Sequence, residues 1–239
     1  MNQSAISERQ PVAVIAGASS GFGSALCQLL LSRGFRVAAL GREPAIRAVV
    51  EEVPGVLAVA CELTNAAEVD RAFGSVEATL GPATAVVYNA HRIQLAPSAE
   101  TSLEMFAESW RVNCLGAFLV AQRALPSMRA FAAGTLIFTG ATGSVRGGQR
   151  SAAFASSKFA LRGLAQSLAR ELSAAGVHVA HVVLDGLIWS ERTRARFPTA
   201  EARACMSPQA LAASYLSLIE QDRSAWTHEL DLRPWTERF

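Results

Sequence analysis

Short apolar runs alternate with longer amphipathic stretches along almost the whole chain. The apolar runs, which predict strands, lie at residues 12–16, 36–40, 56–60, 85–90, 135–140 and 177–184. Near-continuous apolar runs of this length are typical of parallel strands that helices cover on both faces. Between the runs, leucines recur at steps of three and four residues, as in Leu161, Leu164 and Leu168, which indicates one face of a helix. The alternation predicts a single three-layer α/β domain with a doubly wound parallel sheet.

The composition is that of an ordinary globular protein. Hydrophobic residues make up 51% of the 239 positions, charged residues 18%, and the formal net charge is +2. Because there is no basic stripe with interleaved aromatics, and no apolar run of the roughly 18 residues of a membrane span, we expect neither nucleic acid nor membrane as a partner. Residues 1–10 are polar and predict a flexible tail before one domain at 11–239, which we expect to be cytoplasmic. The four cysteines are far apart, so we expect reduced thiols rather than disulfides or a metal site.

A glycine-rich loop follows the first predicted strand. The stretch AGASSGFGSAL places Gly17, Gly21 and Gly23 between strand and helix, with Ser19, Ser20 and Phe22 among them. Glycines at such a junction let the chain turn tightly and approach a pyrophosphate, and the amides at the helix N-terminus then face the anion. The loop predicts a dinucleotide-binding site.

The glycine spacing, G-x-x-x-G-x-G, resembles that of the short-chain dehydrogenase/reductase family. Further motifs follow in the order of that family: YNA at 88–90, WRVNCLGAF with Asn113, SSK ending at Lys158, and LDGLIWS at 184–190. The resemblance implies a Rossmann-like fold, a nicotinamide cofactor and a small organic substrate. It implies cofactor contacts for Asn89, Ala90, Gly186 and Ile188, the last through its backbone. It also implies a homodimer or homotetramer that pairs through helices at 100–128 and 151–173.

The end of the second strand predicts which nicotinamide cofactor is bound. An acidic residue at this position binds the ribose 2′-hydroxyl of NAD, whereas an arginine nearby accommodates the 2′-phosphate of NADP. Gly41 occupies the acidic position and Arg42 follows it. Since guanidinium pairs well with phosphate, we expect NADP(H). Glu62 and Leu63 resemble the pair that lies beside the adenine in the family.

The catalytic positions implied by the resemblance are only partly filled. The family uses a tyrosine, a lysine four residues later, a serine and an asparagine. Lys158 is the only lysine of the chain and stands at the lysine position, and Asn113 stands at that of the asparagine. Phe154 replaces the tyrosine and Ala141 the serine, although a slip of one residue would bring Thr142 to the serine position. A free phenol, with a pKa of about 10, is a poor base without a nearby cation, which explains why the family needs the lysine.

Two further departures concern groups that can carry a proton. His91 stands where the family has glycine after Asn-Ala, and Asp185 replaces the proline of a Pro-Gly turn. Either could transfer a proton. The alternative for His91, which we prefer, is that it only packs against the helix of Asn113, and for Asp185 we prefer a turn, since Asp-Gly is a common turn former. The segment after the sixth strand carries four arginines, Arg192, Arg194, Arg196 and Arg203, which could meet an acidic substrate or form a solvated lid.

Three functions fit these residues. The first is an NADP(H)-dependent oxidoreductase with an incomplete set of catalytic residues, in which Thr142, or a water held by Asn113 and Lys158, stands in for the phenol. The second is an NADP(H)-binding protein without redox turnover. The third is a lyase or isomerase that uses the same pocket. The retained glycine loop, Arg42, Asn113 and Lys158 favour the two functions that bind NADP(H). Of these we expect the first, because the pocket wall, with the Ile188 backbone available to the carboxamide, is intact.

Overall fold

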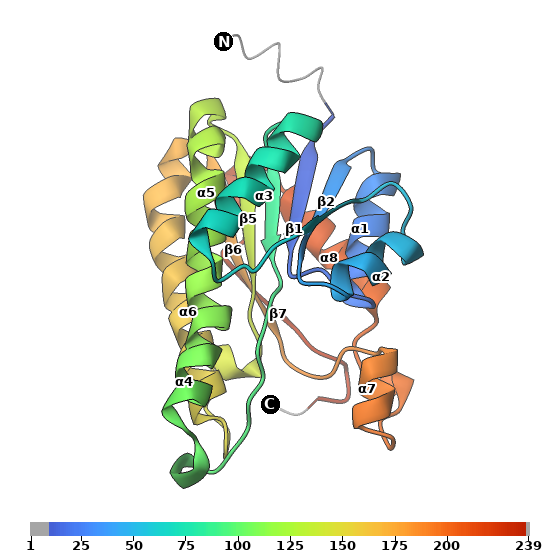
Figure 1. The fold of residues 1–239 in the computed structure, drawn as a ribbon, viewed down its shortest axis with the longest axis vertical. Helices are drawn as coiled ribbons and strands as arrows, with labels where there is room; N and C mark the ends of the chain where they lie inside the picture. The colour runs from blue at the N-terminus through green and yellow to red at the C-terminus, as the bar shows by residue number, and fades with distance from the viewer. Residues whose placement is uncertain (1–9, 238–239) are drawn as a thin grey trace.

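The computed structural model describes residues 10–237, which form one parallel sheet covered by helices on both faces (Figure 1). The strands, in the order β3-β2-β1-β4-β5-β6-β7, are β1 (Val12–Ala16), β2 (Arg36–Gly41), β3 (Leu57–Ala60), β4 (Ala85–Tyr88), β5 (Gly134–Thr139), β6 (Val177–Leu184) and β7 (Glu229–Leu232). All neighbouring strands pair in parallel. The predicted three-layer doubly wound sheet is confirmed. Of the expected tail at 1–10, residues 1–9 lie outside the described part.

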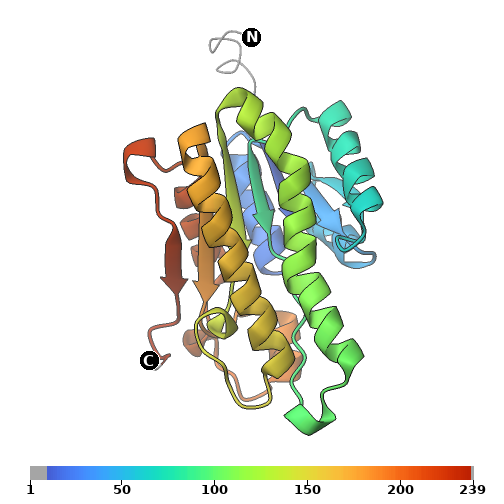
Figure 2. The same ribbon diagram turned by 90° about the vertical axis from the view of Figure 1, so that its left-hand side faces the viewer.

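The helices follow the strands in the expected alternation. They are α1 (Phe22–Ser32), α2 (Ala45–Glu52), α3 (Ala66–Thr79), α4 (Leu103–Trp110), α5 (Gly116–Phe131), α6 (Ala152–Leu172), α7 (Glu191–Arg196) and α8 (Pro208–Ile219). Figures 1 and 2 show α3, α5 and α6 on one face of the sheet and α1 and α8 on the other. The expected helix over 100–128 is divided, because five residues of π-helix, Arg111–Leu115, separate α4 from α5.

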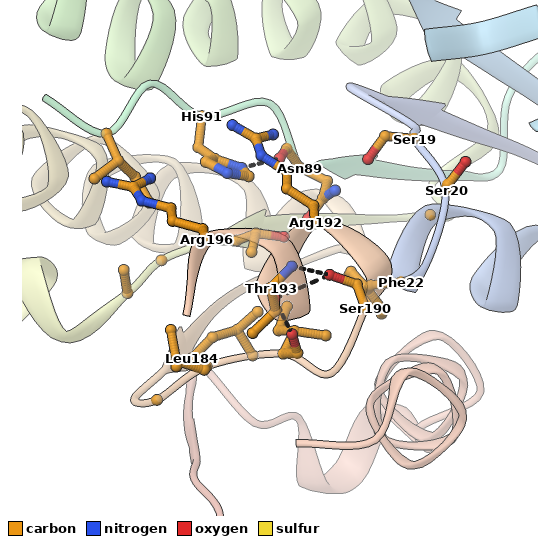
Figure 3. Close-up of a pocket in the computed structure, with 18 of the residues that line it drawn as sticks. Ser19, Ser20, Phe22, Asn89, His91, Leu184, Ser190, Arg192, Thr193 and Arg196 are labelled. Carbon is orange, nitrogen blue, oxygen red and sulfur yellow. Dashed lines mark hydrogen bonds between the residues drawn. The ribbon is translucent and has the colours of Figure 1, made fainter. Parts of the chain in front are cut away.

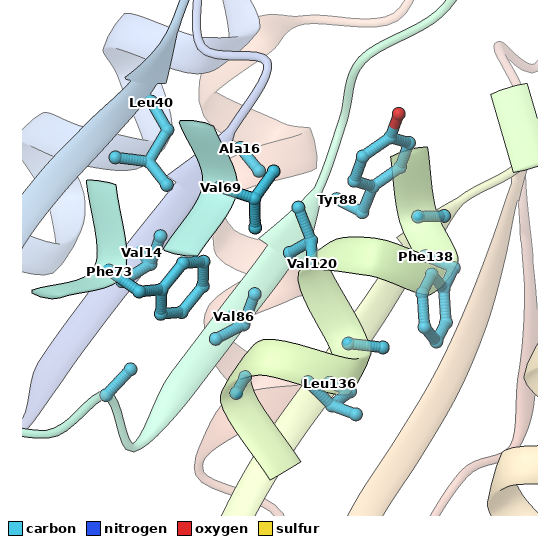
Figure 4. Packing of buried hydrophobic residues seen from close by; sticks show 14 of the residues in the cluster. Val14, Ala16, Leu40, Val69, Phe73, Val86, Tyr88, Val120, Leu136 and Phe138 are labelled. Atoms are coloured by element: carbon cyan, nitrogen blue, oxygen red, sulfur yellow. The ribbon is translucent and has the colours of Figure 1, made fainter. Parts of the chain in front are cut away.

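Alternate residues of each strand supply two separate cores. Val12, Val14 and Ala16 of β1 face α3 and α5, whereas Ala13 and Ile15 face α1 and α8. Figure 4 shows the first core, in which Phe73 of α3 and Val120 of α5 pack onto the sheet. Both faces of the central strands are therefore buried, which explains why their sequences are almost continuously apolar.

The last strand is an edge strand, as the alternating sequence near the end of the chain predicts. β7 pairs with β6 only, and its residues alternate between exposed and half-buried. The four cysteines are buried free thiols. Within residues 10–237, no helix has both the length and the apolar character needed to cross a bilayer.

Candidate functional site

A cavity of about 240 Å³ opens at the carboxyl ends of β1, β4, β5 and β6 (Figure 3). The strand order reverses between β1 and β4, and in open α/β sheets a crevice forms outside the strand ends at such a point. Residues singled out from the sequence that line the cavity are Ser19, Ser20, Phe22, Gly23, Asn89, His91, Ala141, Phe154, Lys158, Gly186, Ile188, Arg192 and Arg196. The fold thus brings together residues from most of the length of the chain.

The glycines of the first loop are required by its geometry. Gly17 has φ of +86°, and a Cβ there would lie 2.3 Å from the backbone nitrogen of Ala90. The Asn89 side chain donates a hydrogen bond of 3.2 Å to the Gly17 carbonyl. The loops after β1 and β4 are therefore locked together, and this contact places Asn89 beside the glycine loop. Gly21 has φ of +88°, which also favours glycine.

The N-terminus of α1 is open to an anion. Side chains of Asn65, Ser102, Ser190 and Ser207 cap α3, α4, α7 and α8. Helix α1, like α2 and α6, has no side-chain cap and no acidic residue in its first turn. It begins after Gly21, and its first two residues, Phe22 and Gly23, line the cavity. Free amide donors and the positive end of the helix dipole favour a phosphate at this position. The residues present thus fit the pyrophosphate of a dinucleotide.

The residues expected around the adenosine lie outside the cavity described above. Arg42, at the end of β2, is 69% exposed at its side chain, and its Nε lies 3.9 Å from the Glu62 carboxylate. Such an exposed, loose ion pair contributes little and leaves the guanidinium able to bind another anion. Glu62 also accepts hydrogen bonds from the backbone and hydroxyl of Thr64. Leu63 is buried in the core shared with α3 and α5.

Lys158 reaches the cavity from α6 with its ammonium buried. Its Nζ donates a hydrogen bond of 2.8 Å to the Thr139 carbonyl at the end of β5. The Thr139 hydroxyl is bonded to the Tyr215 hydroxyl of α8, 2.9 Å away. Burial lowers the pKa of Lys158 to about 7, because the charged amine has lost its water shell. This amine can therefore gain or lose a proton near neutral pH.

The cavity wall beside Lys158 is apolar at the two positions where the resemblance calls for hydroxyls. Phe154 and Ala141 both line the cavity, whereas Thr142 does not. Thr142 starts a short 3-10 turn, Thr142–Ser144, and its hydroxyl donates to the Asp185 carboxylate. The structure therefore does not bring Thr142 to the serine position.

Asp185 is neither an isolated turn residue nor a group that faces the cavity. Its carboxylate is buried and lies 3.4 Å from guanidinium nitrogens of Arg146 and Arg233. Its backbone nitrogen donates to the Leu232 carbonyl of β7. Asp185 thus ties the end of β6 to the last strand and to the loop after β5. The following Gly186 has φ of +144°, so a tight turn does follow the aspartate.

Asn113 lies in the π-helical turn between α4 and α5. Its amide accepts from the Arg92 nitrogen (2.8 Å) and donates to the Arg92 carbonyl (3.0 Å) and the Ser157 hydroxyl (2.8 Å). The side chain is fully buried and does not line the cavity. Asn113 therefore joins the loop after β4 to α6, one residue from Lys158. A π-turn inside an α-helix is common at functional sites.

His91 lies two residues after Asn89 and lines the cavity. Its Nδ1 lies 3.3 Å from the Asn89 carbonyl. Protein atoms around the ring displace water, which disfavours the charged imidazole and lowers the pKa of His91. The Lys158 ammonium lowers it further, so the imidazole is neutral at pH 7. Residue 91 is exposed, and its side chain is one of the groups that line the cavity.

Residues 190–204, which include α7 and are called the lid below, close one side of the cavity. The Ser190 hydroxyl caps α7 by accepting from the Thr193 nitrogen, and the Thr193 hydroxyl donates to the Ile188 carbonyl over 2.6 Å (Figure 3). Ser190 and Thr193 line the cavity but were not singled out from the sequence. The S-x-x-T spacing before a charged helical turn is the signal that could have found them.

The chain is similar to several known proteins. The short chain dehydrogenase family profile matches residues 11–199. A 3-oxoacyl-[acyl-carrier-protein] reductase, MabA, from Mycobacterium tuberculosis is 37% identical over 76% of this chain and 71% of its own length. A short-chain dehydrogenase from Rhodopseudomonas palustris superposes with a TM-score of 0.80 at 30% identity, over 94% of this chain and 99% of that one. An alcohol dehydrogenase from Thermococcus sibiricus, complexed with 5-hydroxy-NADP, has a TM-score of 0.83 at 24% identity, over 96% and 99% of the two chains.

The profile covers well over half of the chain, and residues of the glycine loop, of the turn after β4 and of the segment 184–190 line one cavity with the buried lysine at its wall. The chain belongs to the short-chain dehydrogenase/reductase family of oxidoreductases.

Proposed function

We propose that the protein is an NADP(H)-dependent oxidoreductase with an incomplete set of catalytic residues. One observation carries the proposal: a single cavity runs from the glycine loop, at Ser19 and Gly23, to Lys158 and Ile188. A dinucleotide has its phosphates at one end and its nicotinamide at the other, which matches this arrangement. The T. sibiricus relative with its bound NADP derivative supports the choice of cofactor.

The residues present would hold the cofactor by groups along the cavity. The open N-terminus of α1 receives the pyrophosphate, Arg42 the 2′-phosphate, and Lys158 the nicotinamide ribose. The backbone of Ile188, at the cavity wall, would bind the carboxamide. When bound, the reduced nicotinamide supplies a hydride to an electrophilic carbon of the substrate.

Reduction of a carbonyl also requires a proton on the oxygen. In the absence of the phenol, we assign that proton to Lys158 Nζ, whose buried amine can release it near neutral pH. Thr142 and Asn113 do not serve this purpose, because their side chains are bonded elsewhere. The Nζ contact with the Thr139 carbonyl holds the amine at the cavity wall.

A second candidate is an NADP(H)-binding protein without redox turnover. The observation that favours it is the apolar wall at Phe154 and Ala141, since neither side chain can orient a substrate oxygen. Both candidates require the same cofactor and differ only in chemistry.

The first test is titration of the purified protein with NADPH and with NADH, followed by nicotinamide fluorescence. We expect NADPH to bind more tightly, and Arg42→Gln to weaken NADPH binding about tenfold while NADH is unaffected, because only the 2′-phosphate meets the guanidinium. Arg47→Gln is the matched control, since Arg47 pairs with Glu43 at 3.5 Å. Binding of neither nucleotide would rule out both candidates.

We also propose that the protein is a homodimer that pairs through the layer of α4, α5 and α6. Figure 2 shows these helices side by side on the outer face of the molecule. They expose large apolar side chains to solvent: Leu103, Phe106, Trp110, Phe118 and Phe159. An apolar surface of this kind is typical of an interface. The buried free thiols are consistent with a reducing compartment, and we propose a cytoplasmic location.

A further inference from the structure

The arginines of the lid fall into two groups. Arg194 pairs with Glu191 at 3.3 Å, and Arg203 pairs with Glu201. Arg192 and Arg196 instead line the cavity, and neither has a carboxylate partner among residues 10–237. Figure 3 shows both side chains extending from α7 on the side of the cavity that holds His91. The lid therefore neutralises the two arginines outside the cavity and leaves two charges at the cavity itself.

Arg192 and Arg196 are four residues apart in α7 and so lie on the same helical face. Like charges at this spacing destabilise a helix unless an anion lies between them. The Arg196 guanidinium rests over the Phe197 ring, 5.5 Å from its centroid. That contact orients the side chain but leaves its positive charge uncompensated.

The rest of the cavity lining adds to this excess of positive charge. Lys158 adds a third cationic side chain, and the lining among the described residues includes no aspartate or glutamate. Apolar side chains, among them Ile93, Leu187 and Phe197, form much of the remaining wall. A ligand that complements such a cavity has an apolar body and one anionic end.

We propose that Arg192 and Arg196 bind a carboxylate, or an anion of similar shape, at the end of the substrate opposite its reacting carbon. This inference rests on the proposed function, which places the carbonyl beside Lys158. The Ser190 cap and the Thr193 contact with Ile188 fix the backbone at the start of α7, from which both arginine side chains extend. A cofactor phosphate has the same chemistry, so the experiment must separate the two sources of the anion.

The probe is 4-oxo-4-phenylbutanoate, compared with its uncharged methyl ester. Each is titrated calorimetrically into protein saturated with NADP⁺, in which a ketone can bind but cannot be reduced. We expect the acid to bind more tightly than the ester. Arg192→Gln and Arg196→Gln should each weaken acid binding about tenfold, as for loss of one charge-assisted hydrogen bond, and leave ester binding unchanged. Arg194→Gln and Arg203→Gln are matched controls from the same lid and should change neither.

Several results would overturn the inference. These are equal binding of acid and ester, no binding of the acid, or an equal loss in the control variants. Weaker binding of NADP⁺ by Arg192→Gln, with acid binding retained, would assign that guanidinium to the cofactor instead. Failure of NADP⁺ itself to bind would contradict the proposed function, and the acid and ester titrations, repeated on nucleotide-free protein, would still test the arginine pair.

Discussion

Two side chains decide whether this cavity can do ordinary carbonyl chemistry. Phe154 differs from the expected tyrosine by one hydroxyl, and Ala141 from the expected serine by another. Both line the cavity, as Lys158 does. The cavity shape is therefore close to that of a complete site, while the tyrosine and serine hydroxyls that would hold a substrate oxygen are missing.

Restoring both hydroxyls should increase reduction of small ketones. For Phe154→Tyr with Ala141→Ser we expect a rise in kcat/KM of about 10²-fold or more, because a positioned general acid typically contributes that much. The measurement is NADPH oxidation, followed by absorbance, on a panel of ketones. Adding Lys158→Met should remove the gain, since the new phenol then lacks the cation that lowers its pKa. An unchanged rate would show that the cavity has been rebuilt for other chemistry.

The π-turn between α4 and α5 depends on contacts with the end of β4. The Tyr88 hydroxyl donates to the Val112 carbonyl. A Cβ at Gly116 would lie 2.4 Å from that hydroxyl oxygen and 3.1 Å from the Leu63 carbonyl. Gly116 is therefore the position at which α5 allows the tyrosine to reach the helix, and the same turn carries Asn113.

At the scale of the elements, we predict that Tyr88→Phe partly offsets the stability that Gly116→Ala loses. Gly116→Ala should lower the free energy of unfolding by about 1–3 kcal/mol through overpacking. Tyr88→Phe removes the clashing oxygen but leaves the Val112 carbonyl unpaired, at a cost of about 1 kcal/mol. The double variant should lose less than the sum of the two, with a coupling of about 1 kcal/mol in urea unfolding.

Gly163 on α6 supplies the control for this cycle. A Cβ there meets nothing within 4 Å, so Gly163→Ala should leave stability unchanged or raise it by about 1 kcal/mol. Additive losses in the Tyr88 and Gly116 cycle would contradict the proposed contact between them.

At the scale of the whole molecule, the apolar layer of α4, α5 and α6 predicts the oligomeric state. Phe118→Glu and Phe159→Glu place a charge on this layer, and each should convert a dimer to a monomer because burying an unpaired carboxylate is costly. Sedimentation equilibrium measures the mass directly. Trp235→Glu is the control, since Trp235 is 85% exposed but lies beyond β7. A monomeric wild-type protein would disprove the interface.

Much of the architecture could be predicted from local patterns. The apolar runs at 12–16 and 177–184 coincide with β1 and β6, and others differ by a residue or two at their ends. Within the apolar run at 85–90, the strand ends at Tyr88, because Asn89 and Ala90 turn to contact Gly17. The division of the helix at 100–128 carried no local signal, since it depends on Tyr88 and Gly116 meeting across the fold.

The sequence by itself determined the sheet, the glycine loop and the position of Lys158. Each of these follows from periodicity or from spacing over a few residues, which the chain carries locally. Only the tertiary structure decided that Ala141 faces the cavity while Thr142 turns to Asp185, and that Arg192 and Arg196 face inward while Arg194 pairs with Glu191. The reason is physical: which partner a polar side chain finds depends on residues that only folding brings within hydrogen-bond distance.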